Sequence, residues 1–196
     1  MSATAIAPER KLFTPEDLLR LPDGGAGYEL LDGRLKETSV GTESSRIGGE
    51  IYYALRAYIR ETDAGWAFPA DTPFRCFADA PGRVRKPDAA YISLARMPLE
   101  TYVDEGYCTV VPDLVAEVVS PTDFFTDVAV KRDQWLSAGV RTVWVVEPET
   151  RTIYAHRPDG VAFLRSTDTL TADGILPGFA VPIADLFRKP GEGVGK

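Results

Sequence analysis

The feature that most constrains the fold is a pair of short, almost wholly apolar segments separated by an amphipathic stretch. The segments are PDLVAEVVSP, residues 112–121, and VRTVWVVEP, residues 140–148. Near-continuous apolar strands are typical of a sheet that is covered on both faces. The stretch between them predicts a helix that starts near Thr122 or Asp123 and ends at Gly139. A strand, a helix and a strand in this order predict a right-handed crossover between parallel strands.

The remaining segments add elements around this unit. Thr14 is a good helix N-cap, so a short helix is expected from there to Pro22. The dipeptide Asp32-Gly33 favours a tight hairpin turn, and apolar residues at three- and four-residue spacing predict a long helix over 42–61. The other expected elements are extended segments at 65–77 and 82–94, a loop at 95–111, a C-terminal hairpin, a turn at Pro177-Gly178 and a short closing helix. We therefore expect an α/β fold with a mixed central sheet flanked by helices on both faces.

Length and composition bound the class of protein. The 196 residues fit one domain, 1–196, with an ordered core at about 11–188. Cys76 and Cys108 lack the spacing of a disulfide framework or zinc site, and His156 is the only histidine. No apolar run reaches the ~18 residues of a membrane span and no secretory pattern opens the chain, so we expect a cytoplasmic protein. The net charge of −7 disfavours a generally basic surface that coats nucleic acid, but allows a local basic cleft.

Glu117 is the exceptional residue of the first apolar strand. A buried carboxylate must be protonated, paired with a cation or bound to a metal. Asp113 shares its strand face but lies ~13 Å away, too far to hold the same ion. Asp88, in the extended segment VRKPDAAYIS, is the better partner, because acids on adjacent strands can approach within ~5 Å. Such a pair fits Mg²⁺ or Mn²⁺.

A lysine on the following helix completes the candidate site. Lys131 falls on a stripe with Val128 and Trp135 that faces inward, although an alternative stripe through Arg132 leaves Lys131 at its margin. Lys86, two residues before Asp88, is an alternative ammonium. The basic run of Arg83, Arg85 and Lys86 is interpreted either as a phosphate contact or, more commonly for such a run, as protection of a sheet edge.

These segments together resemble the Uma-two family, a bacterial branch of the PD-(D/E)XK, restriction-endonuclease-like nucleases. The resemblance rests on RKPDAAYIS, PDLVAEVVSP, a lysine on a helix that ends in GV, VWVVEP and LPGF, and runs from about Phe13 to Phe187. It implies a restriction-endonuclease-like fold in which Asp88 and Glu117 bind the metal. The lysine position of the motif is Val119 here, and the branch implies that Lys131 has taken over its role.

The resemblance also implies that Glu29, in YELLDGRL, is an additional upstream acid. Ser44 stands where relatives often carry a histidine. The implied activity is Mg²⁺- or Mn²⁺-dependent hydrolysis of phosphodiester bonds in DNA or RNA, with Asp88, Glu117, Lys131 and Glu29 as the catalytic set. The alternative is a catalytically inactive protein of the same fold that binds nucleic acid or a protein partner. A homodimer is expected, because two-fold dimers are the commonest soluble assembly.

Overall fold

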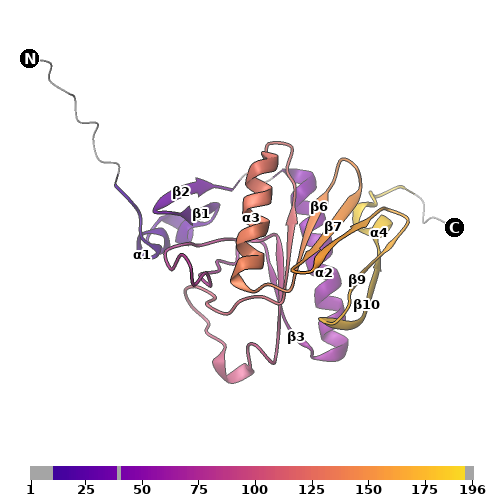
Figure 1. The fold of residues 1–196 in the computed structure, drawn as a ribbon, viewed down its shortest axis with the longest axis horizontal. Coiled ribbons are helices and arrows are strands. Elements are labelled where there is room, and N and C mark those ends of the chain that lie inside the picture. The colour runs from indigo at the N-terminus through magenta and orange to yellow at the C-terminus, as the bar shows by residue number, and fades with distance from the viewer. Residues whose placement is uncertain (1–10, 39–40, 193–196) are drawn as a thin grey trace, which may run out of the picture.

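The centre of the fold is a six-stranded mixed sheet, which the computed structural model shows within residues 11–38 and 41–192 (Figure 1). The strands lie in the order β3-β4-β5-β6-β7-β8; β5 and β6 are parallel, and the other neighbours are antiparallel. Their bounds are β3 Gly65–Pro69, β4 Ala89–Ser93, β5 Leu114–Val118, β6 Thr142–Glu147, β7 Thr152–Arg157 and β8 Gly160–Leu164. The parallel pairing of β5 with β6 around a helix confirms the predicted crossover.

Helices cover both faces of this sheet. The helices are α1 Pro15–Leu19, α2 Thr42–Thr62, α3 Phe125–Ala138 and α4 Ile183–Phe187, with 3-10 turns η1 Pro22–Gly25 and η2 Leu99–Thr101. On one face, α2 packs Ile47 and Leu55 into the cluster that contains Trp144. On the other face, α3 packs Trp135 into the cluster that contains Val143. The expected α/β architecture is therefore confirmed, and no helix in the described residues is long and apolar enough to cross a membrane.

Two smaller antiparallel sheets flank the central one. They are β1 Tyr28–Leu31 with β2 Arg34–Glu37, and β9 Thr169–Ala172 with β10 Leu176–Pro182. The first is the predicted hairpin: Asp32 and Gly33 both have positive φ, 48° and 74°, as this tight turn requires. Leu30 forms an isolated bridge with Val84, so the hairpin is held beside the segment that leads into β4. Glu29 is thereby brought towards the central sheet.

Two details of the sequence prediction were wrong. Helix α3 begins at Phe125 without a side-chain cap, because the carboxylate of Asp123 instead accepts a hydrogen bond from the Ser120 amide at 2.8 Å. Pro177-Gly178 is not a turn between elements but lies inside β10, at a register irregularity where Gly178 has a φ of 82°. A bulge and a turn both favour glycine, so sequence did not distinguish them.

Candidate functional site

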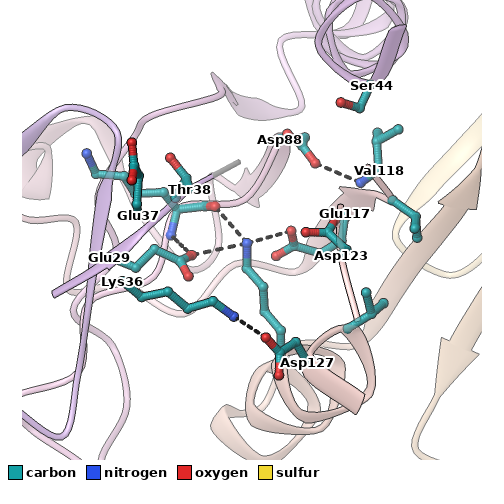
Figure 2. A pocket seen from close by; sticks show the side chains of 14 residues that line it. Glu29, Lys36, Glu37, Thr38, Ser44, Asp88, Glu117, Val118, Asp123 and Asp127 are labelled. Atoms are coloured by element: carbon teal, nitrogen blue, oxygen red, sulfur yellow. Dashed lines mark hydrogen bonds and ion pairs between the residues drawn. The ribbon is translucent and has the colours of Figure 1, made fainter. Parts of the chain in front are cut away.

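A small cavity of about 100 Å³ lies where the β1–β2 hairpin, the start of β4, the end of β5 and helix α3 meet (Figure 2). It is lined by Glu29, Lys36, Glu37, Thr38, Ser44, Lys86, Asp88, Glu117, Val118, Val119, Asp123, Asp127, Val128 and Lys131. The four residues predicted as the catalytic set, Glu29, Asp88, Glu117 and Lys131, are all among them. The fold thus brings together side chains that are up to 102 residues apart.

Glu117 lies near the end of β5, is buried, and has both carboxylate oxygens engaged. The indole Nε1–H of Trp135 donates to Oε1 at 2.7 Å, and Nζ of Lys131 lies 2.7 Å from Oε2. Burial raises the pKa of Glu117 to about 7; the charge of Lys131 opposes this rise, whereas Asp88 adds to it. The ion pair considered from sequence is therefore present, but it does not restore an ordinary carboxylate pKa.

Lys131 lies on α3, and its ammonium pairs with two carboxylates of the cavity. Its ammonium lies 2.7 Å from Glu117 and 3.1 Å from Glu29, and donates to the backbone carbonyl of Lys86 at 3.0 Å. These three acceptors match the three hydrogens of the group. Burial would lower the pKa of Lys131, but the charges of Glu117 and Glu29 outweigh it and raise the pKa. The inward-facing stripe predicted for α3 is confirmed.

Glu29 is the most strongly compensated acid of the cavity. It is 2% exposed and pairs with Arg85 at 2.6 Å, with Lys131, and with the backbone N–H of Lys86 at 2.9 Å. Burial alone would raise its pKa, but the cations Lys131 and Arg85 lower the pKa to about 2. Glu29 is therefore ionised at neutral pH and anchors the lysine.

Asp88 directly precedes β4 and is half-buried. Its Oδ2 accepts a hydrogen bond from the backbone N–H of Val118 at 2.7 Å, which fixes it beside the residue that follows Glu117. Burial raises the pKa of Asp88, and Lys131 partly offsets this. On the other side, Asp88 packs against α2 at Gly48, where an added Cβ would lie 3.1 Å from the Asp88 Cβ. A side chain at residue 48 would crowd Asp88.

The basic run before Asp88 does not have the role expected of a sheet-edge protector. Arg85 is buried, pairs with Glu29 and donates to Gln134. The Lys86 ammonium is also buried, but it donates to the carbonyl of Gly25 at 2.9 Å and lies 3.4 Å from Asp71. That interpretation was wrong for both residues because their partners come from distant segments. Since Lys86 is directed to these groups, the geometry favours Lys131 as the ammonium of the site.

Two further residues singled out from sequence have structural partners. Asp113 accepts a hydrogen bond from the Ser93 amide at 2.8 Å and pairs with Arg96 at 3.1 Å. It directly precedes β5 and joins the start of this strand to the end of β4. Ser44 exchanges hydrogen bonds with the backbone of Gly41 at the start of α2. The Ser44 hydroxyl therefore caps the helix.

The donor set suits a hard divalent ion bound by few protein groups. No cluster of three or more Asp, Glu, His or Cys side chains arranged as metal ligands is found within residues 11–38 and 41–192. Mg²⁺ commonly takes one or two carboxylates and completes its shell with water and phosphate oxygens. Asp88 and Glu117 line one cavity, and burial raises the pKa of both carboxyl groups. They fit such an ion.

Sequence reasoning missed three contributors to the site. Trp135 was assigned to the core, which is correct, but its N–H also holds Glu117. Gln134 was given no role, and Arg85 was interpreted as a phosphate contact or a sheet-edge residue, yet together they fix Glu29. The available signal was spacing, because residues 134 and 135 follow Lys131 by three and four positions and so lie on the same side of the helix.

Comparisons with known proteins identify the family and the fold of the chain. A search of curated proteins found no match. Among solved structures, a crystal structure titled as a putative nuclease belonging to DUF820 from Anabaena variabilis ATCC 29413 superposes with a TM-score of 0.72 and 19% sequence identity, covering 89% of this chain and 97% of that one. This match shows that the two proteins share one fold. The sequence model of the Uma2 family, described as "Putative restriction endonuclease", matches residues 15–184, and the chain belongs to this family.

Proposed function

We propose that the protein is a metal-dependent nuclease that hydrolyses phosphodiester bonds in DNA or RNA. The observation that carries the proposal is that Asp88, Glu117 and Lys131, from three separate elements, line one cavity. Two under-compensated acids beside a half-buried lysine are costly for stability alone, and perturbed carboxylates in a cleft are typical of functional sites. Family and fold point to the same activity.

Asp88 and Glu117 would hold one Mg²⁺ or Mn²⁺. When bound, the ion supplies Lewis-acid polarisation of a phosphoryl oxygen and lowers the pKa of a coordinated water. Glu117 presents Oε2 on the Lys131 side, while the Trp135 N–H holds Oε1. Asp88 is oriented by the Val118 amide. Both carboxylates are therefore positioned before a ligand arrives, which limits the cost of ordering them.

Lys131 supplies the positive charge of the reaction. Its ammonium would orient the attacking water and offset the charge that grows on the phosphate oxygens. The water oxygen bonds to phosphorus, the bond from phosphorus to one ester oxygen breaks, and the proton of the water passes through solvent to the leaving oxygen. Glu29, ionised and fixed by Arg85, keeps the ammonium at the cavity.

A second candidate, a catalytically inactive binding module of the same fold, is favoured by one observation. Position 119, where the Glu-x-Lys motif places its lysine, is a valine, and all three hydrogens of the Lys131 ammonium have protein acceptors. In that state the lysine neutralises Glu117 and leaves the site balanced without catalysis. The nuclease remains our proposal because Asp88 and Glu117 line the same cavity as Lys131 and the family is described as "Putative restriction endonuclease".

The test is an assay of purified protein on plasmid, single-stranded DNA and RNA, with Mn²⁺ or with EDTA. We expect cleavage with Mn²⁺ only, and its loss in Asp88→Asn, which keeps a carbonyl acceptor for the Val118 amide while removing the charge. Glu61→Gln, a charge change on α2 outside the cavity lining, is the matched control and should cleave normally. Cleavage that survives Asp88→Asn, or needs no metal, would reject the proposed site.

We further propose that the enzyme acts in the cytoplasm as a homodimer, since two copies of one site suit the cutting of two strands. Light scattering coupled to size-exclusion chromatography measures the assembly directly. A monomer at micromolar concentration would remove the dimer from the proposal and leave the chemistry of the site unchanged.

A further inference from the structure

Lys36 joins the hairpin to helix α3 at the edge of the cavity. It lies on β2 and lines the same cavity as the proposed catalytic residues. Its ammonium is 2.7 Å from Oδ2 of Asp127, which lies in the first turn of α3. Figure 2 marks this ion pair with a dashed line. The side chains are 43% and 48% exposed, respectively. The pair is therefore open to solvent at the rim, unlike the pairs made by Lys131.

The other two lysines that line the cavity already have hydrogen-bond and ion-pair partners. Lys131 has three acceptors close to its ammonium, and Lys86 is bonded to the Gly25 carbonyl and paired with Asp71. Among the described residues that line the cavity, Lys36 is thus the lysine whose ammonium can meet an incoming anion without breaking a buried network. Exchange of partners at Lys36 costs little, because exposed ion pairs contribute ~0–1 kcal/mol.

The acidic residues around the cavity favour a role for such a cation in binding a polyanion. Six acids line it against three lysines: Glu29, Glu37, Asp88, Glu117, Asp123 and Asp127 against Lys36, Lys86 and Lys131. The whole chain carries a net charge of −7. A nucleic-acid backbone is repelled by this field unless a rim cation pairs with a phosphate.

We propose that Lys36 is a substrate-binding residue that contacts a backbone phosphate beside the cleaved bond, and that Asp127 occupies the place of this phosphate in the free protein. The inference rests on the proposed nuclease function and adds a phosphate subsite to it. Binding then exchanges the Asp127 carboxylate for a phosphate at Lys36. The two members of one ion pair therefore have opposite effects on substrate affinity.

This opposition gives the test. The anisotropy of fluorescein-labelled single-stranded DNA, duplex DNA and RNA is measured in EDTA, which prevents cleavage, over a series of NaCl concentrations. Lys36→Gln should raise Kd about threefold and reduce the salt dependence by about one released counterion. Asp127→Asn should lower Kd by a similar factor, because it frees Lys36 and removes a repelling charge. Lys36→Arg should bind nearly as the parent does.

A purely structural ion pair gives a different result. Each substitution then removes the same contact between the hairpin and α3, so both variants shift Kd in the same direction, or neither does; either outcome overturns the inference. The matched controls are Arg151→Gln and Glu192→Gln, which break a pair of similar exposure, 48% and 45%, outside the cavity lining. Both should leave Kd unchanged, and melting temperatures confirm that every variant is folded.

The binding and cleavage assays distinguish failure of the nuclease function from failure of the phosphate subsite. Parent protein that binds none of the three probes would refute nucleic acid as the substrate, and the phosphate subsite with it. Parent protein that binds and cleaves, while Lys36→Gln and Asp127→Asn behave alike, would refute the subsite only.

Discussion

The glycine pair in the middle of α2 gives a prediction whose sign depends on Asp88. Gly48 and Gly49 are adjacent in the helix, where each glycine costs roughly 1 kcal/mol relative to alanine. A Cβ on Gly49 meets nothing within 4 Å. A Cβ on Gly48 would lie 3.1 Å from the Cβ of Asp88, tighter than an ordinary van der Waals contact.

The expected changes in the free energy of unfolding differ because the surroundings of Gly48 and Gly49 differ. Gly49→Ala should gain about 1 kcal/mol, equivalent to a rise in melting temperature of about 2–4 °C for a chain of this size. Gly48→Ala gains the same helix propensity but must displace Asp88, whose hydrogen bond from Val118 is 2.7 Å long. Because a hydrogen bond to a charged group contributes about 1.5–3 kcal/mol, we expect Gly48→Ala to be neutral or destabilising by about 1 kcal/mol.

The consequence for function separates the two variants further. Displacement of a proposed ligand should weaken metal binding about 10-fold in Gly48→Ala, whereas Gly49→Ala should bind as the parent does. The assay is thermal unfolding in EDTA and in a Mg²⁺ or Mn²⁺ series, since a ligand of the native state raises the melting temperature. Equal stabilisation and equal metal response in both variants would refute the argument that the absent side chain at residue 48 positions Asp88.

Three further predictions concern the buried network. The pKa of Glu117 is about 7 in the folded protein and 4.5 for an ordinary glutamate. Its protonated side chain therefore contributes stability that is fully present below pH 4.5 and is lost as the pH rises through 7. Glu117→Gln should therefore become more stable than the metal-free parent above pH 7, by at most about 3 kcal/mol, and a pH-independent difference in unfolding free energy would contradict this. Trp135→Phe leaves a buried acceptor unpaired, so it should cost about 1–3 kcal/mol and weaken metal binding in calorimetry, while unchanged values would show that the N–H is dispensable. Lys131→Met should cost about 3–5 kcal/mol and abolish cleavage while metal binding is kept or tightened, and cleavage at the parent rate would reject its proposed role.

Apolar patterning and turn residues predicted most of the fold, because most helices and strands follow these local patterns. The apolar runs around Glu117 and Trp144 fall on β5 and β6, and Asp32-Gly33 forms the hairpin turn. The errors arose where a tertiary or loop partner decided the outcome. Asp123 has the right chemistry for a helix cap, yet it bonds to Ser120. Such a competition between equivalent hydrogen-bonding partners leaves no trace in composition or periodicity.

The sequence pointed to acidic residues of the candidate site but not to the residues that hold them in place. A carboxylate inside an apolar strand signals a partner, which led from Glu117 to Asp88 and Lys131. Glu29 came only from the family resemblance, because YELLDGRL is an ordinary hairpin sequence. Arg85 was misinterpreted since a basic run gives no sign of where its side chains go. Its partner Gln134 is 49 residues away in sequence.

The buried carboxylate of Glu117 is compensated by a lysine that belongs to another element. A lysine at residue 119 would follow Glu117 on the same strand face, as the Glu-x-Lys motif requires, but Val119 is there. Lys131 reaches Glu117 from α3 instead, and its Nζ is 2.7 Å from the carboxylate. Buried charge is compensated by proximity in space and not by proximity in sequence, so a cation can move between elements whenever the crossover helix packs over the strand end. In this fold, helix α3 of the parallel β5–α3–β6 unit packs over the end of β5. A lysine can therefore reach Glu117 from the helix as well as from the strand, and sequence order alone does not determine which element carries it.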